Sequence, residues 1–330
     1  MTFLINRRKA FRGGAPPDPD GASNVDEVYL WNGSSESTYG TTYNVIDYVD
    51  RTATTGNAVD RGDDTNSGRG TTGAHSDTYA FRMGLQSGIT AVAEAINYID
   101  LTTQSGNSAD VGDMVASPSY DPGSGITGDS YGFMMNRGAT NSIDYIDLST
   151  TSGDASDRGD STVNLRKPFG VQGDTYGFSG GGFTTGASGK DTLYLSNNMI
   201  EYIDHSLTTG NASDRGDLNV ARRGHCATSG STYGYFLWGR SADSTSEAGG
   251  SVQNSIEYID QTTTTGNGTD RGDMTSSRSH LRGSSDCRGY TNCVVGSGIW
   301  LEYFDVTTTS GNATARGERS IAGYNAGCCN

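Results

Sequence analysis

Six segments of the chain alternate apolar and polar residues and then end in the same polar turn. Each begins like Ile256-Glu-Tyr-Ile-Asp, a period of two that predicts a half-buried β-strand. The Thr-Thr-Gly-Asn that follows predicts a hairpin turn, because Gly and Asn tolerate positive φ. A second strand is expected through Ala-Ser-Asp-Arg-Gly-Asp. The segments occupy residues 45–64, 96–114, 143–161, 200–218, 256–274 and 301–319.

Between these segments lie a stretch of small residues and then an aromatic strand, as in STYGYFLWG at 231–239. The tyrosines of the six repeated segments (Tyr48, Tyr98, Tyr145, Tyr202, Tyr258 and Tyr303) are separated by 50, 47, 57, 56 and 45 residues. Four strands in a period near this length are typical of one β-propeller blade. The pattern therefore predicts an all-β, six-bladed β-propeller over residues 25–330.

The sixth unit lacks its aromatic strand, and a matching one, DEVYLWNG, stands at residues 26–33 near the other end of the chain. We therefore expect the C-terminal segment 319–329 to pair with strand 26–33. Such pairing closes the ring and removes two exposed strand edges.

The order of these elements resembles kelch repeats. Gly180 to Gly182, Glu201 to Asp204, and Arg222 are the best-matching pieces, whereas Gly-Asn-Ala stands where kelch repeats have a tryptophan. The denser Tyr-Ile-Asp, Thr-Thr-Gly-Asn-Ala, Asp-Arg-Gly-Asp pattern is similar to repeats in virion and tail-associated proteins of marine tailed bacteriophages. This resemblance implies a structural or host-contact virion component, present in several copies. The alternatives are an extracellular or cell-surface lectin and a glycan-degrading enzyme on the same scaffold.

Composition agrees with many short strands and tight turns, with 48 Gly, 6 Pro and 33% hydrophobic residues in 330. The 23 basic and 38 acidic residues give a net charge of −15, which disfavours nucleic acid and anionic membranes as partners. No apolar run reaches the roughly 20 residues of a membrane helix. The five cysteines lack metal-site spacing and are expected to be free thiols, with a Cys287–Cys293 disulfide as the alternative.

Arg-Gly-Asp occurs four times, at 61–63, 158–160, 215–217 and 271–273. Because the tripeptide belongs to the repeat, we expect an architectural role in which arginine pairs with aspartate between blades or within turns. This prediction covers Arg61, Asp63, Arg158, Asp160, Arg215, Asp217, Arg271 and Asp273. A calcium site at Asp214 and Asp217 is one alternative. An integrin-type adhesion ligand is another, although it requires an exposed loop tip.

Residue types needed for catalysis do not gather in the sequence. The four histidines have no metal-type spacing, and no Gly-x-Ser-x-Gly elbow or phosphate loop stands in a strand-to-helix context. We therefore expect no catalytic residues, metal or cofactor. A carboxylate pair for glycoside hydrolysis remains the alternative, since acidic residues are plentiful.

The connections from each aromatic strand to the next repeat vary in length, whereas the Thr-Thr-Gly-Asn turns do not. In a propeller such variable loops share one rim, and binding residues often lie on loops of a rigid scaffold. These loops carry Tyr39, Tyr43, Lys190, Tyr194, Trp238 and Arg240. We expect them to contact sugar rings of a host surface glycan, or else only to cover the rim.

Residues 1–24 are expected to stand outside the ring as an extended attachment arm. The arm combines basic and apolar residues ahead of a Pro/Gly/Asp linker, namely Phe3, Leu4, Ile5, Arg7, Arg8, Lys9, Phe11 and Arg12. This mixture predicts docking on an acidic partner, which the resemblance makes another virion protein. A solvated tail is the alternative.

Overall fold

The protein is all-β, as the sequence predicts. The computed structural model describes residues 3–6, 27–34, 42–50, 58–68, 72–84, 94–115, 123–136, 140–188, 191–241, 243–245, 249–278, 284–286, 292–297, 300–318 and 328–329. Within these ranges the chain forms strands, bends and turns, and no helix. Accordingly, none of the described residues belongs to a helix that could cross a membrane.

The first half of the chain forms three four-stranded antiparallel sheets among the described residues, each built from consecutive strands. Sheet 1 contains β1 (Phe3–Asn6), β2 (Glu27–Ser34), β3 (Thr42–Asp50) and β4 (Val59–Gly68). Sheet 2 contains β5 (Thr72–His75), β6 (Tyr79–Met83), β7 (Ala95–Asp100) and β8 (Ala109–Asp113). Sheet 3 contains β9 (Ser124–Thr127), β10 (Tyr131–Met135), β11 (Ser142–Asp147) and β12 (Ser156–Asp160).

The second half of the chain forms three more large sheets and one separate strand pair within its described residues. Sheet 4 contains β13 (Phe169–Gln172), β14 (Tyr176–Gly180), β17 (Met199–Asp204) and β18 (Ser213–Asp217). The hairpin of β15 (Phe183–Ser188) and β16 (Asp191–Ser196) is inserted into it. Sheet 5 contains β19 (Cys226–Ser229), β20 (Tyr233–Leu237), β21 (Arg240–Ser241), β22 (Ser251–Asp260) and β23 (Thr269–Arg278), with β24 (Ser284–Asp286) parallel to β19. Sheet 6 contains β25 (Asn292–Ser297), β26 (Trp300–Asp305), β27 (Thr314–Glu318) and β28 (Cys328–Cys329).

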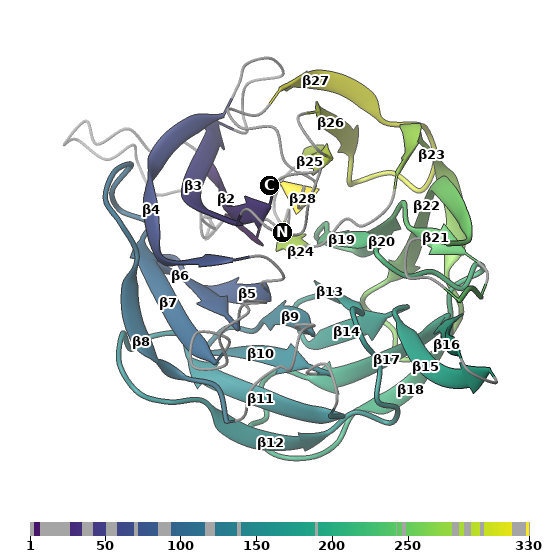
Figure 1. Cartoon of the computed structure of the whole chain (residues 1–330), viewed down its shortest axis with the longest axis horizontal. Coiled ribbons are helices and arrows are strands. Elements are labelled where there is room, and N and C mark those ends of the chain that lie inside the picture. Colours follow the sequence, from purple (N-terminus) through teal and green to yellow (C-terminus); the bar gives the residue numbers. More distant parts are fainter. Residues whose placement is uncertain are drawn as a thin grey trace.

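The six large sheets stand around a common centre (Figure 1). Their inner strands β5, β9, β13 and β19 lie nearest the centre, and each contacts the inner strand of the next sheet. The last sheet returns to the first, because β28 contacts β1 and β2.

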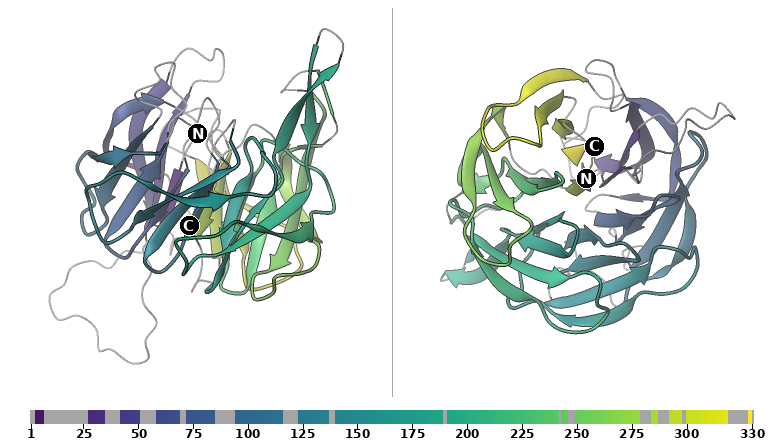
Figure 2. Two further views of the ribbon diagram at one scale, coloured as in Figure 1. Left: turned by 90° about the horizontal axis from the view of Figure 1, so that it is seen from below. Right: turned by 180° about the vertical axis from the view of Figure 1, so that it is seen from behind.

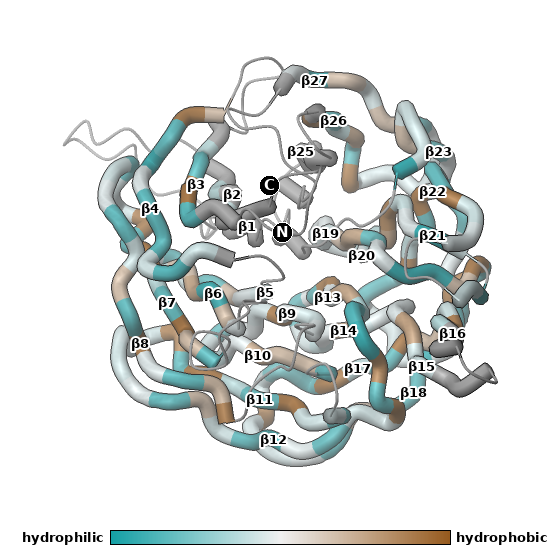
Figure 3. The backbone as a smooth tube through the Cα atoms, in the orientation of Figure 1, coloured by the Kyte–Doolittle hydropathy of each residue, from teal (hydrophilic) through white to brown (hydrophobic). Residues whose placement is uncertain are grey.

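The hydrophobic core lies between neighbouring sheets. One cluster joins Tyr235 and Ile256 of sheet 5 to Phe304 of sheet 6, and other clusters join sheets 1 and 2, 2 and 3, 3 and 4, and 4 and 5. Apolar and polar positions are accordingly interspersed along the strands of every sheet (Figure 3). Each sheet therefore requires its neighbour to bury its apolar side chains.

Two rims follow from the antiparallel order of the strands. We call the side with the short turns after β5, β9, β13 and β19 and after β7, β11, β17 and β22 the turn rim. The opposite side carries residues 181–188, 191–198, 238–241, 243–245 and 249–250, which we call the loop rim of sheets 4 and 5. The β15–β16 hairpin extends away from the body of the molecule on that side (Figure 2, left).

The closure of the ring differs from the expected pairing of residues 26–33 with 319–329. In the structure β2 lies between β1 and β3, and β28 pairs with β25 in sheet 6. The N-terminal strand β1 occupies the edge of β2 that the C-terminal segment was expected to fill. Phe3 to Asn6 thus belong to sheet 1 rather than to an arm outside the ring.

Candidate functional site

Arginines of the outer strands bridge neighbouring sheets. Arg215 of β18 donates to three carbonyl oxygens in the turn between β22 and β23. The acceptors are Asp260 (2.8 Å), Thr263 (3.3 Å) and Gly266. The guanidinium also lies over the Phe178 ring, 5.4 Å from its centroid. Arg61, Arg158 and Arg271 bridge to the next sheet in the same way.

The glycine and aspartate of the tripeptide take part in the same contact. Gly216 has a φ of 140°, and a Cβ there would lie 2.7 Å from the Gly266 carbonyl oxygen. The Asp217 N–H donates to Oδ1 of Asn267 at 3.1 Å, and the Gly268 N–H donates to the Asp217 carbonyl at 2.7 Å. We call this contact, an outer strand against the third-to-fourth-strand turn of the next sheet, the inter-sheet joint.

The contacts at the joint differ from the arginine–aspartate pairing that the sequence predicts. The arginines do act between sheets, but they donate to main-chain carbonyls and, from Arg61, Arg215 and Arg271, to a threonine hydroxyl, and not to the aspartates of the tripeptide. Burial along β18 turns Arg215 inward and leaves Asp217 exposed. Asp63, Asp160, Asp217 and Asp273 each contribute their main-chain N–H instead.

The four arginines are 4–6% exposed, which leaves no open guanidinium for an adhesion receptor. Asp214, proposed as a calcium ligand, accepts the Gly216 N–H through its Oδ1 atom at 2.9 Å. Within the described residues, no group of three or more His, Cys, Asp or Glu side chains is placed to hold a metal ion.

The loop rim of sheets 4 and 5 is cross-braced by polar contacts. Tyr194 and Ser244 exchange two main-chain hydrogen bonds of 2.8 and 3.2 Å. Arg223, which is 1% exposed, donates to Ser196 Oγ at 2.5 Å and to the Gly249 carbonyl at 2.9 Å. The hairpin from sheet 4 is therefore held against the loop of sheet 5.

Three of the expected rim residues have described side chains, and Tyr194 and Arg240 take part in the brace through their main chains. Tyr194 is half-buried, with its ring centroid 5.4 Å from that of Phe183. Arg240 is half-buried and donates to the Gly250 carbonyl at 3.2 Å. Trp238 is not placed to contact a sugar ring as expected, because it is fully buried and its Nε1 donates to the Ser276 carbonyl at 2.9 Å.

The side chains of the other expected site residues are not described. Tyr39, Lys190, Arg7, Arg8, Lys9, Phe11 and Arg12 lie outside the described residues. Tyr43, Phe3, Leu4 and Ile5 are placed only by their backbone, in β3 and β1.

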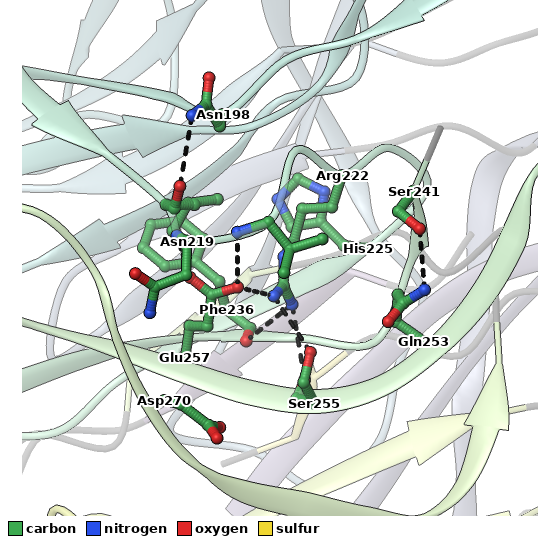
Figure 4. A network of polar contacts seen from close by, with 12 residues as sticks. Asn198, Asn219, Arg222, His225, Phe236, Ser241, Gln253, Ser255, Glu257 and Asp270 are labelled. Carbon is green, nitrogen blue, oxygen red and sulfur yellow. Dashed lines mark hydrogen bonds and ion pairs between the residues drawn. The ribbon is translucent and has the colours of Figure 1, made fainter. Parts of the chain in front are cut away.

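Below the brace lies a buried ion pair between Arg222 and Glu257 (Figure 4). Arg222 also donates to the Trp238 carbonyl at 3.1 Å, and Glu257 accepts the Asn219 N–H at 2.6 Å. Burial lowers the pKa of Arg222, and the Glu257 carboxylate opposes that effect. The neighbouring His225 is buried beside this cation, and burial and Arg222 together lower its pKa well below the usual value.

Glu257 occupies a position of the repeat that is usually acidic, and the sequence analysis did not identify this position as functional. Regular alternation places Ile and the following acid of each repeat on opposite faces. In the structure a register shift stands between Ile256 and Glu257, and both side chains are buried. The acid then accepts a main-chain N–H of the preceding sheet, as in Glu201 with Thr162 (2.5 Å) and Glu302 with Thr275 (2.9 Å). An acid or amide recurs at this position in the sequence, and that recurrence could have indicated a shared structural role.

A cleft opens on the turn rim between sheets 2 and 3, with a volume of about 660 Å³. Its wall includes Asp77 and Tyr79 from sheet 2 and Asp129, Tyr131 and Asp147 from sheet 3. The cleft thus carries three acidic residues in its wall, and it lies on the rim opposite the braced loops.

Comparisons with known proteins assign no family to this arrangement. No protein-family model matches the chain, and no curated protein matches it either.

Proposed function

We propose that the chain is a six-bladed, kelch-like β-propeller that acts as a non-enzymatic display scaffold. Six sheets around one centre, with cores between neighbours, support the propeller. The resemblance of the repeats to those of phage virion proteins supports a structural or adhesion role in a virion, tail-associated and present in several copies. In this role the loop rim contacts a host-surface glycan or a neighbouring subunit.

The observation that carries this proposal is the brace on the loop rim. Arg223 ties the β15–β16 hairpin of sheet 4 to the loop of sheet 5 through Ser196 and Gly249. A binding surface that is already ordered loses less conformational entropy when its partner binds. A hairpin held rigidly beyond the body of the ring is therefore suited to presenting residues to a partner.

Shortening the hairpin tests the role of the rim. Replacing residues 185–194 with Asn-Gly, a sequence suited to a two-residue hairpin turn, should leave the ring folded. We expect the same unfolding transition, but loss of binding to host cells and to a glycan array. Leu207→Ser, a change at a 52%-exposed apolar residue on the turn rim, is the control and should bind like the parent.

Undiminished binding by the shortened protein would contradict the proposal. A signal on the array favours the glycan as partner, whereas binding only to purified particles favours a neighbouring subunit. Turnover of the polysaccharide by the parent protein would replace the scaffold role with an enzymatic one.

The attachment role of the N-terminal residues requires a variant that spares β1. Deleting the whole segment would remove Phe3–Asn6 from sheet 1. Changing Arg7, Arg8, Lys9 and Arg12 to alanine removes the basic charge and keeps the strand. We expect reduced incorporation into particles, and unchanged incorporation would rule out the basic residues as the docking element.

A further inference from the structure

Basic residues gather on the loop side of sheets 4 and 5. Among the described side chains, five arginines occupy the joint position of the repeat and a sixth is paired with Asp64 at 2.7 Å, namely Arg61, Arg158, Arg215, Arg271, Arg316 and Arg82. The other basic side chains that the structure describes are Arg166, Lys167, Arg222, Arg223, Arg240 and Arg278. All of these lie in the connections that follow β12, β18 and β20 or at the end of β23, opposite the turn rim.

Main-chain hydrogen bonds place the first of these segments side by side. Arg166 and Phe183 exchange two hydrogen bonds of 2.8 and 2.9 Å. The neighbouring Gly182 N–H donates to the Arg222 carbonyl at 2.8 Å. Backbones paired in this way lie about 5 Å apart. The connection that holds Arg166 is therefore close to the connection that holds Arg222 and the next residue, Arg223.

The same kind of pairing continues into sheet 5. Arg223 and Arg240 exchange two main-chain hydrogen bonds of 3.0 and 2.9 Å. The Gly239 N–H then donates to the carbonyl of Arg278 at 3.1 Å. Segments that are far apart in the sequence thus bring their arginines together across the loop side of two sheets.

Three of these arginines reach the surface. The side chains of Arg166, Arg240 and Arg278 are half-buried, whereas Arg223 is 1% exposed and lies among them. The guanidinium of Arg166 is 5.1 Å from the centroid of the Phe183 ring, and the Nε of Arg278 donates to a serine hydroxyl at 3.0 Å. We call Arg166, Arg223, Arg240 and Arg278 the arginine row.

The arginine row reverses the sign of the charge locally. The whole chain has a net charge of −15, and the turn rim carries exposed carboxylates such as Asp77 and Asp129. On the loop rim, Asp243 is the one acid with a described side chain, and its Oδ1 accepts the Ser196 N–H at 3.1 Å. A local excess of arginine on an acidic protein attracts an anionic ligand to that place.

The surroundings of the row favour a particular kind of anion. Guanidinium groups bind carboxylates through two parallel hydrogen bonds. The half-buried Tyr194 packs on Phe183 beside Arg166 and has both an apolar ring and a hydroxyl, which suits a sugar. Nucleic acid, with its dense negative charge, would be repelled by the acidic body on either side of the row. A polysaccharide with separated carboxylates matches a short row of cations beside an aromatic ring.

We propose that the arginine row binds the carboxylates of an acidic polysaccharide. This inference rests on the proposed display role, because it names the class of ligand for the same rim. Arg240 and Arg278 bind the carboxylates, and Tyr194 packs against a sugar ring. Arg223 adds positive charge beneath them while it holds the brace.

The test measures binding of oligosaccharides of hyaluronan and of alginate to the full chain by calorimetry. Both probes carry carboxylates, on alternate sugars in hyaluronan and on every sugar in alginate. Their methyl esters keep the same sugars without the charge. We expect saturable binding of at least one acid and binding at least tenfold weaker for its ester. Because the arginines are partly exposed to solvent, the affinity for the acid should also fall as salt is added.

Replacing Arg240 and Arg278 together with glutamine should weaken binding of the acid at least tenfold. Lysine at both positions keeps the charge and should retain most of the affinity. Arg278→Gln alone should also weaken binding, which keeps the test valid if the change at Arg240 disturbs the brace. Adding Leu207→Arg to the glutamine double variant returns one positive charge at a 52%-exposed residue of the turn rim. This control should not restore binding, because the charge is on the wrong side of the ring.

Three results would overturn the proposal: no saturable binding of either acid, equal binding of the acids and their esters, or recovery of binding through Leu207→Arg. Self-association of the parent that the glutamine double variant abolishes, with no effect on the oligosaccharides, would instead assign the row to the acidic turn rim of a second copy. If the protein with the shortened hairpin loses binding to host cells while acids and esters bind equally, the display role stands and the acidic ligand is refuted. Undiminished binding of that protein to host cells refutes the display role itself.

Discussion

The guanidinium of Arg215 and the carbonyl oxygen of Gly266 are hydrogen-bonded across the boundary between two sheets. The donor lies in β18 of sheet 4, and the acceptor lies in the turn between β22 and β23 of sheet 5. Since the arginine is 5% exposed, the bond is shielded from competing water. The Arg-Gly-Asp tripeptide is therefore best understood as part of the contact that fixes one sheet to the next.

Replacing Arg215 with methionine should lower the free energy of unfolding by about 3 kcal/mol, the range of one or two charged hydrogen bonds. The change leaves the carbonyls of Asp260 and Gly266 without this donor. Urea unfolding followed by fluorescence measures the loss. Asp217→Asn keeps the main-chain N–H and changes only an exposed carboxylate, so it should alter stability by less than about 0.5 kcal/mol. Equal losses in the two variants would contradict the assigned roles.

Gly216→Ala should be more damaging than Gly210→Ala, although both glycines have positive φ. The values are 140° and 107°, but only at Gly216 would a Cβ meet the next sheet, 2.7 Å from the Gly266 carbonyl oxygen. We expect a cost of about 1 kcal/mol at Gly210 from backbone strain alone and roughly 3 kcal/mol at Gly216. Thermal unfolding of the two variants side by side checks the order, and a reversed order would refute the close approach.

Glu257→Gln should lower the free energy of unfolding by about 3–5 kcal/mol, because it leaves the buried Arg222 cation uncompensated. Glutamine keeps the size of the side chain and an oxygen for the Asn219 N–H, so the loss reports on charge. The double variant Arg222→Met, Glu257→Met should recover part of the stability. A loss below about 1 kcal/mol in the single variant would show that the pair is not the main stabilising contact there.

His225 should make the protein less stable in mild acid. Its pKa in the folded state lies well below 6.5, so above that pH both the folded and the unfolded states hold neutral imidazole. As the pH falls below 6.5, the unfolded state takes up a proton that the folded state refuses, and stability falls by up to about 1.4 kcal/mol per pH unit.

His225→Phe removes this titration and places a third ring beside Phe169 and Phe236, which His225 contacts now. Urea unfolding between about pH 7 and pH 5 should therefore show a shallower loss of stability in the variant than in the parent. Identical slopes would mean that His225 has the same pKa in the folded and the unfolded states.

Local patterns in the sequence were sufficient to locate the strands of the repeats, but not β1, the β15–β16 hairpin or the detailed pairing. The aromatic strand expected at residues 26–33 is β2, Glu27–Ser34, and the segment beginning at Ile256 forms the end of β22 and the start of β23. The burial of Glu257 was not predictable from a period of two, because the register shift before it breaks the alternation.

The strand that pairs with the free edge of β2 could not be predicted from local sequence patterns either. Two segments, Phe3–Asn6 and 319–329, could each supply a short strand for the same edge, and alternation within either segment does not choose between them. Trp238 has a φ of 58°, a backbone conformation that the identity of its side chain does not predict.

The inter-sheet joint also determines how pieces of this protein would associate. Sheets 1, 3, 4 and 5 each present an arginine-bearing strand at the outer edge, and the turn of the following sheet accepts that arginine. The two partners of such a joint are therefore never the same surface. Contacts of this head-to-tail kind propagate unless a ring closes them, whereas two-fold contacts end at a dimer. A fragment with one or two sheets would therefore have an unused donor at one side and an empty acceptor at the other. We expect such fragments to grow into open filaments, whereas in the full chain β28 of sheet 6 contacts β1 and β2 of sheet 1.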